Sequence, residues 1–173
     1  MQLLTPKFLT AKIAKLAVEQ ALKMVMEGHT GDMIKRKACH IVVMVSAMEG
    51  EPETGFPVWP NNKYSVPYLL YEHSYGDGNE WTGKYDKIAR GKALQLWHER
   101  NDDRTDIMPH LLFPGDAIYY GGVKRHGIVV ACSGVQEWFD KMIAGIIADL
   151  LIGLAYNEWM TSPDKEVGVT FLT

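Results

Sequence analysis

The stretch that decides the fold is residues 119–134, which read Tyr-Tyr-Gly-Gly-Val-Lys-Arg-His-Gly-Ile-Val-Val-Ala-Cys-Ser-Gly. A double glycine is typical of a break in the backbone, so we expect a strand over 117–120 to end at Gly121-Gly122. His126-Gly127 predicts the tight turn of a β-hairpin. The run 128–132 is mostly β-branched and lies between glycines, which predicts a buried strand after the turn.

The segment after this stretch predicts a long helix. Ser133-Gly134-Val135-Gln136 has the form of a capping box, in which the hydroxyl and the side-chain amide each satisfy a free backbone N–H. We expect the helix to run to about Met160. Charged and polar residues interrupt the segment, so it predicts a buried helix and not one that spans a bilayer. Its apolar residues form a wide stripe of pairs four apart: Trp138/Phe139, Met142/Ile143, Ile146/Ile147, Leu150/Leu151 and Leu154/Ala155.

The rest of the chain predicts a mixed α+β domain. Thr10 is expected to cap a helix that reaches Glu27 and ends at Gly28. Residues 40–45 form an apolar run typical of a central strand covered on both faces. An edge strand over 66–71 and a helix over 81–99 follow, so the predicted order is α, β, β, α, β, β, α. With 173 residues, we expect one domain over 1–173 with an antiparallel sheet flanked by helices.

Composition excludes several classes of protein. The chain is 47% hydrophobic and 23% charged, with a net charge of −3, which is typical of a soluble globular protein. The run Lys35-Arg36-Lys37 is too short for a nucleic-acid interface. Cys39 and Cys132 each border an apolar run, so we expect buried free thiols. No secretory signal is visible, and we expect a cytoplasmic protein that binds neither membranes nor nucleic acid.

The stretch also resembles a known family. Three segments carry the resemblance: Gly121, Gly122, Val123, Ser133, Gly134, Asp140 and Ala144, then 88–93, then Leu9-Thr10 with Ala14 and Ala21. These segments are similar to the GlcG/HbpS-like family, often labelled haem-degrading, which also includes the C-terminal domain of PduO. The resemblance implies a profilin-like fold and a ligand such as haem or a corrinoid. The chain departs from the family at Ser46, where Asp is common, and at Lys124, where Pro is common.

Seven residues are candidates for binding a ligand. Backbone amides at Gly121, Gly122 and Val123 could meet an anionic group, although a bulge that packs under a neighbouring element explains the glycines equally well. A helix N-terminus at Ser133-Gly134 also suits an anion. The resemblance adds Lys92, which could direct an ammonium at the ligand, and Asp140, although the first turn of a helix favours a carboxylate in any case.

The histidines and the divergent segment 49–82 leave further interpretations open. No spacing among the six histidines indicates a metal site. If the ligand is haem, His110 is the candidate axial ligand. The segment 49–82 is rich in Pro, Gly and aromatic residues, which could line a pocket, cover a subunit interface or simply pack a long loop: Phe56, Trp59, Tyr64, Tyr68, Tyr71, Tyr75 and Trp81.

Three functions therefore remain open. The first is a homo-oligomeric protein that binds an anionic, largely flat small molecule. The second is an enzyme acting on a small organic acid, which needs a titratable pair in one pocket, such as Lys92 with Asp140 or Asp116. The third is a structural assembly subunit. The helix after Ser133 is apolar on more faces than a monomer easily covers, so we expect self-association.

Overall fold

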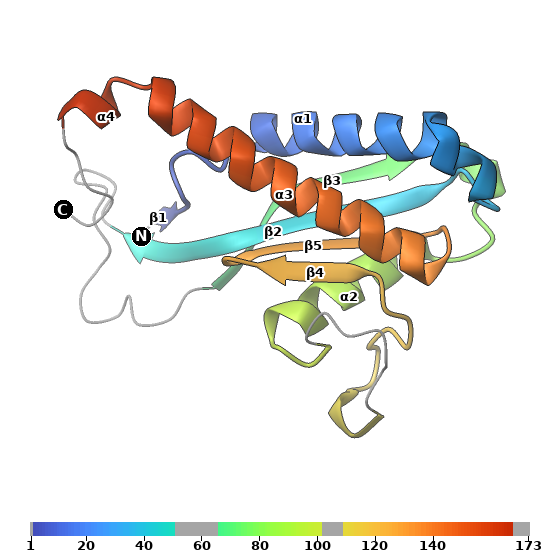
Figure 1. Ribbon diagram of the computed structural model, residues 1–173. Helices are drawn as coiled ribbons and strands as arrows, with labels where there is room; N and C mark the ends of the chain where they lie inside the picture. The colour runs from blue at the N-terminus through green and yellow to red at the C-terminus, as the bar shows by residue number, and fades with distance from the viewer. Residues whose placement is uncertain (1, 51–65, 102–108, 168–173) are drawn as a thin grey trace.

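The computed structural model describes residues 2–50, 66–101 and 109–167 (Figure 1). The elements, in chain order, are β1 (Gln2–Leu4), α1 (Ala11–Leu22), β2 (Cys39–Gly50), β3 (Val66–Tyr75), α2 (Tyr85–Trp97), β4 (Gly122–Arg125), β5 (Ile128–Ser133), α3 (Glu137–Thr161) and α4 (Asp164–Val167). A wide π-helical turn, Lys23–Glu27, continues α1. The predicted order α, β, β, α, β, β, α matches the structure, except that its fifth element is at Gly122–Arg125 and not at 117–120, and β1 and α4 are added at the ends.

The sheet is antiparallel and β2 is its central strand. β2 pairs with β3 and with β5, β5 pairs with β4, and β1 pairs with the end of β2. Among the described residues β3 pairs only with β2, as expected of an edge strand. The predicted α+β fold with an antiparallel sheet is confirmed.

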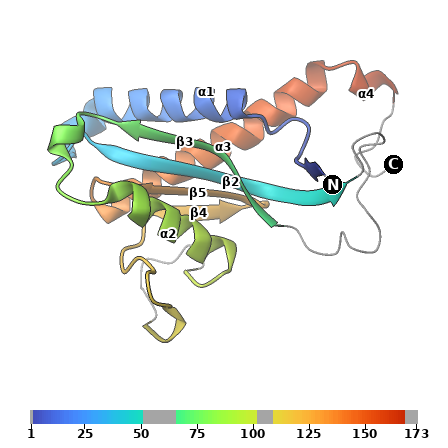
Figure 2. The ribbon, with the colours of Figure 1, turned by 180° about the vertical axis from the view of Figure 1, so that it is seen from behind.

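The helices cover both faces of this sheet. Figures 1 and 2 show α1 and α3 on one face and α2 on the other. Alternate residues of β2 divide between the two faces: Ile41, Val43 and Val45 join the core under α1 and α3, whereas Val42 and Met44 join the core under α2. Since both faces are covered, β2 reads as a continuous apolar run and not as an alternating one.

Several predicted helix boundaries are confirmed. The Thr10 side chain accepts a hydrogen bond from the Ile13 backbone N–H at 3.3 Å, which caps α1. The helix and its π turn end at Gly28. α3 ends at Thr161, one residue from the predicted end. Among the described residues, no helix, α3 included, is long and apolar enough to cross a membrane.

Two predictions in the deciding stretch are wrong. Residues 117–120 form no strand, because Ala117 is held by Gln95: the side-chain amide donates to Ala117 O at 3.1 Å and accepts from Ala117 N at 3.1 Å. The neighbouring strand β4 begins after the break, at Gly122. The hairpin turn is confirmed, since His126 and Gly127 have positive φ angles of 48° and 78°, as a type I′ turn requires.

The predicted capping box is the second error. Ser133 is the last residue of β5, and Gln136 is the N-cap of α3 without a side-chain capping bond. The Gln136 amide instead donates to Met33 O at 3.0 Å and accepts from Lys35 N at 3.4 Å. A tertiary contact with the segment before β2 therefore replaces the local cap.

The helix α2 begins at Tyr85, not at Trp81. Three apolar residues of this helix are not fully buried: Ile88 and Trp97 are half-buried, and Leu94 is 44% exposed. The fully buried positions instead include two polar side chains, Lys92 and Gln95. The core under α2 is therefore built around polar groups.

Candidate functional site

The most unusual group in the core is the ammonium of Lys92. This side chain is 1% exposed. Its Nζ donates to Cys132 O at 2.8 Å and to Asp140 Oδ2 at 3.1 Å. Two of the three donors of the ammonium are thus used. A lysine is almost never this deeply buried unless it is paired.

Asp140, in the first turn of α3, is the partner of this lysine. It is 2% exposed, and its Oδ1 accepts from Val135 N at 3.2 Å. Burial raises the pKa of Asp140 more than the neighbouring ammonium of Lys92 lowers it. The sequence names Lys92 and Asp140 as a candidate titratable pair, and the structure brings them into contact across 48 residues of chain.

The double glycine lies directly behind this pair. Gly121 has a φ of +133°, and a Cβ placed on it would lie 2.6 Å from Asp140 Cβ and 2.8 Å from Lys92 Nζ. A Cβ on Gly122 would lie 2.5 Å from Leu96 Cδ1. The glycines therefore allow the backbone to approach α2 and α3 closely, as the bulge interpretation proposes.

A cavity of about 270 Å³ opens in front of the pair. Four of the seven candidate residues line it, namely Lys92, Ser133, Gly134 and Asp140. Gly121, Gly122 and Val123 are not among its lining residues, so the ligand contact expected of them stays a prediction. The remaining lining residues come from the segment before β2, from the start of α2, and from both sides of the β4–β5 hairpin: Arg36, Thr82, Gly83, Tyr85, Ile88, Tyr119, Val135 and Glu137.

Arg36 is the main positive charge on the open side of the cavity. Its Nε donates to Gly134 O at 3.1 Å and its Nη1 donates to Thr82 Oγ1 at 3.4 Å. The guanidinium also lies 5.7 Å from the centre of the Tyr85 ring. These contacts hold the guanidinium in place, yet no carboxylate among the described residues pairs with it. Such a guanidinium is well suited to bind a carboxylate or phosphate.

The N-terminus of α3 forms another wall of the cavity. Glu137, its first residue, lines the cavity, and the N-cap Gln136 makes no capping bond. The first amides of a helix without a cap carry partial positive charge. The wall therefore offers donors to an anion, beside the carboxylates of Glu137 and Asp140, of which Asp140 is paired with Lys92.

Sequence reasoning missed Arg36 and the hydroxyl groups of the cavity. Arg36 belongs to the basic run 35–37, for which the sequence indicates no binding role. It reaches Gly134 across 98 residues of chain. Thr82 and Tyr85 hydrogen-bond to each other at 2.7 Å, but nothing local in the sequence links them to Gly134. Only the folded chain brings these residues together.

Other predicted site residues lie elsewhere. Asp116 does not join Lys92: its carboxylate binds Arg100 and accepts from Phe113 N at 2.8 Å. The Arg100 guanidinium holds the pKa of Asp116 below its usual value. His110 is exposed in a short turn, Pro109–Leu111, and does not line the cavity. Phe56, Trp59 and Tyr64 lie outside the described residues.

Neither the two cysteines nor any described group of metal-ligating side chains contributes to the site. Cys39 and Cys132 are buried free thiols, as predicted, and burial raises the pKa of Cys132, which keeps it a poor nucleophile. No group of three or more His, Cys, Asp or Glu side chains suited to a metal ion occurs within 2–50, 66–101 and 109–167.

A buried histidine beside the cavity gives a testable pH dependence. His40 is 4% exposed, with Nδ1 2.9 Å from Ser74 Oγ and Nε2 3.4 Å from Glu72 Oε2. Burial lowers the pKa of His40 more than the Glu72 carboxylate raises it. The unfolded chain therefore binds a proton at this ring at a higher pH than the folded chain does.

We therefore expect stability to fall as the pH drops below about 6.5, the usual histidine value, until the pH passes the lower folded pKa. The slope from one proton is at most about 1.4 kcal/mol per pH unit. Urea unfolding between pH 7.5 and 5 measures it. The slope should shrink in His40→Gln and persist in the control His110→Gln. An unchanged slope in His40→Gln would contradict the assignment.

Comparisons with known proteins do not assign the chain to a family. No family model matches the sequence, and searches of curated proteins and of solved structures also give no match. The resemblance to the GlcG/HbpS-like family therefore remains an expectation from the residues that carry it.

Proposed function

We propose that the protein is a homo-oligomer that binds a small anionic molecule in the cavity beside Lys92 and Arg36. The observation that carries this proposal is the guanidinium of Arg36, which bonds to Gly134 O and Thr82 Oγ1, has no carboxylate partner among the described residues, and lines the same cavity as the N-terminus of α3. Lys92 adds a buried cation with one remaining donor. Together these groups supply the charge-assisted hydrogen bonds that hold a carboxylate.

The size of the cavity narrows the ligand class. Pockets for drug-sized ligands are usually about 300–1,000 Å³, and this cavity is about 270 Å³. A small organic anion fits this volume better than a macrocycle. Haem or a corrinoid, which the family resemblance implies, would need space beyond this cavity. A haemin titration distinguishes a small organic anion from a macrocycle as the ligand, because a saturable shift of the Soret band would favour the macrocycle.

Octanoate binding, followed by NMR chemical shifts, tests the anion site. Arg36→Gln should weaken binding about tenfold or more, because it removes a charged hydrogen-bond donor. Glu137→Gln should strengthen binding, because it removes the one unpaired negative charge on the wall. The control Arg90→Gln changes a guanidinium that Glu72 already holds. Equal octanoate affinity in Arg36→Gln, Glu137→Gln and the unmodified protein would refute the site.

The Lys92–Asp140 contact supports a second candidate, an enzyme acting on a small organic acid. Burial raises the pKa of the Asp140 carboxyl, and a carboxyl with a raised pKa beside a charged partner in a cavity is a candidate for acid–base catalysis. The pair lines the same cavity as Arg36. Turnover of a small acid that is lost in Asp140→Asn, while octanoate still binds, would favour this candidate over simple binding.

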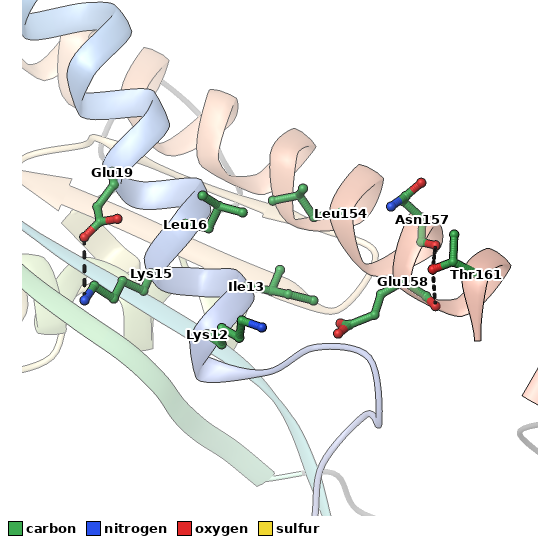
Figure 3. A pocket seen from close by; sticks show the side chains of 9 residues that line it. All are labelled: Lys12, Ile13, Lys15, Leu16, Glu19, Leu154, Asn157, Glu158 and Thr161. Atoms are coloured by element: carbon green, nitrogen blue, oxygen red, sulfur yellow. Dashed lines mark hydrogen bonds and ion pairs between the residues drawn. The ribbon is translucent and has the colours of Figure 1, made fainter. Parts of the chain in front are cut away.

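The oligomeric part of the proposal rests on the outer surface of α1 and α3. A groove of about 420 Å³ separates these helices. Figure 3 shows Leu16 and Leu154 pointing toward one another across it, with charged and amide side chains around them. Leu16 is 42% exposed. An apolar floor with a polar rim of both charges is the usual anatomy of a protein interface. The rim residues are Lys12, Lys15, Glu19, Asn157, Glu158 and Thr161.

Gly153 provides a second argument for association through α3. Glycine inside a helix costs about 1 kcal/mol relative to alanine. A Cβ on Gly153 would meet no atom within 4 Å, so packing within the described residues does not require glycine there. It lies beside Leu154, in an adjoining recess lined by Ile146 and Leu150. Close approach of a helix from a second copy would explain the glycine.

Gly153→Leu should therefore shift the protein toward monomer without destabilising the subunit, because the added side chain blocks the approach. Sedimentation velocity at micromolar concentration measures the shift. The control Gly78→Leu adds the same side chain at another open glycine. A protein that is monomeric before any substitution would refute the oligomer.

A further inference from the structure

The anion cavity is adjoined by a second recess along α2. This recess has a volume of about 330 Å³ and is lined by Lys84, Lys87, Ile88, Gly115, Asp116 and Ala117. Ile88 lines both the recess and the anion cavity. The two spaces therefore meet at one apolar side chain, between α2 and the loop that leads to β4.

The residues of α2 give this combined groove a charge pattern. Lys84, Ile88 and Lys92 are spaced four apart, which places them on one side of the helix. The groove thus has cations on both sides of Ile88: Arg36 and Lys92 line the anion cavity, and Lys84 and Lys87 line the second recess. Because Arg36 bonds to Thr82, two residues before Lys84, the two pairs of cations are separated by Ile88 and not by the length of α2.

The lysines of the second recess are available to a ligand. Neither Lys84 nor Lys87 forms an ion pair within the described part of the chain. The one carboxylate in the recess, that of Asp116, is already bound by Arg100 and by Phe113 N. The Asp116 carboxylate is thus a weak competitor for the two ammonium groups.

The loop opposite α2 is held in place without a ligand. Gln95 binds both backbone groups of Ala117. Gly91 lets this loop rest on the helix, since a Cβ on Gly91 would lie 3.5 Å from Ala117 N. A groove that is already formed loses less conformational entropy when a ligand binds.

We infer that the ligand is an elongated molecule with a carboxylate at each end and an apolar middle, that is, an α,ω-dicarboxylate. The inference rests on the proposed anion site and adds a second one. One carboxylate binds Arg36 and the N-terminus of α3, the methylene chain crosses Ile88, and the other carboxylate binds Lys84 and Lys87.

The test compares suberate with octanoate, which has the same chain length and one carboxylate. Suberate should bind about tenfold more tightly, because its second carboxylate gains ion pairs with two exposed lysines. The double variant Lys84→Gln/Lys87→Gln should lose this advantage and keep its octanoate affinity. The control Lys23→Gln/Lys165→Gln removes the same charge at exposed positions outside the groove and should keep the advantage.

The outcomes separate this inference from the proposed function. If octanoate and suberate bind equally, or if Lys84→Gln/Lys87→Gln leaves the suberate advantage intact, the second carboxylate site is wrong and the anion cavity stands. If neither acid binds, or if Arg36→Gln leaves octanoate binding unchanged, the anion cavity itself is wrong.

Discussion

Lys92→Met is expected to destabilise the protein by about 3–5 kcal/mol, because it leaves the buried carboxylate of Asp140 without its counter-charge. It also removes the donor to Cys132 O. Such a loss is a large share of the stability of a small domain, which is typically about 5–15 kcal/mol. Urea unfolding at pH 7 measures it.

Two variants make this expectation specific to the buried pair. Lys92→Met/Asp140→Asn should recover much of the loss, since asparagine removes the charge and keeps an acceptor for Val135 N. Lys23→Met, at an exposed lysine, should change little. A double variant no more stable than Lys92→Met would show that the lost stability is not due to an unpaired charge.

Asp140 also gives the pair a pH dependence whose sign can be stated. Its folded pKa is raised by burial, so the folded state binds the proton more readily than the unfolded chain. Charging Asp140 therefore costs stability as the pH rises through the folded pKa. In Lys92→Met, without the ammonium that lowers this pKa, the same loss should extend to a higher pH and become larger.

Gly121→Ala is expected to have the second large effect, about 3 kcal/mol or more. The new Cβ would clash with Asp140 Cβ at 2.6 Å, and overpacking of this kind costs about 1–3 kcal/mol. The φ angle of +133° adds strain of about 1–3 kcal/mol for a residue with a side chain. Thermal or urea unfolding measures the sum.

Gly115→Ala distinguishes the cost of the backbone strain from the cost of the side-chain clash. Gly115 also has a positive φ, +91°, but a Cβ there would meet no atom within 4 Å. It should therefore show the backbone strain without the clash, at about 1–2 kcal/mol. If Gly121→Ala costs no more than Gly115→Ala, the tight packing of the double glycine against α2 and α3 is not what holds the site.

The sequence by itself determined the elements whose signals are local. His126-Gly127 forms the hairpin turn because both residues adopt positive φ angles. The Thr10 hydroxyl caps the first helix. Neither signal depends on contacts with distant parts of the chain. The β-branched run of β5 and the apolar run of β2 likewise decide their strands. These signals act over a few residues, which is why the order of elements could be predicted.

Only the tertiary structure decided the rest. Ser133 has the local sequence form of a helix cap, but it pairs with β2 as the last residue of β5. The Gln136 side chain hydrogen-bonds to the backbone of Met33 and Lys35 and caps nothing. Ala117 was expected in a strand, but Gln95 bonded to its backbone instead. The sequence pattern around Lys92 made it a candidate ligand-binding residue, but its burial and its bond to Cys132 O come from the packing of α2 against β5. Arg36 reaches the site across 98 residues, and no local pattern reports a contact made over that separation.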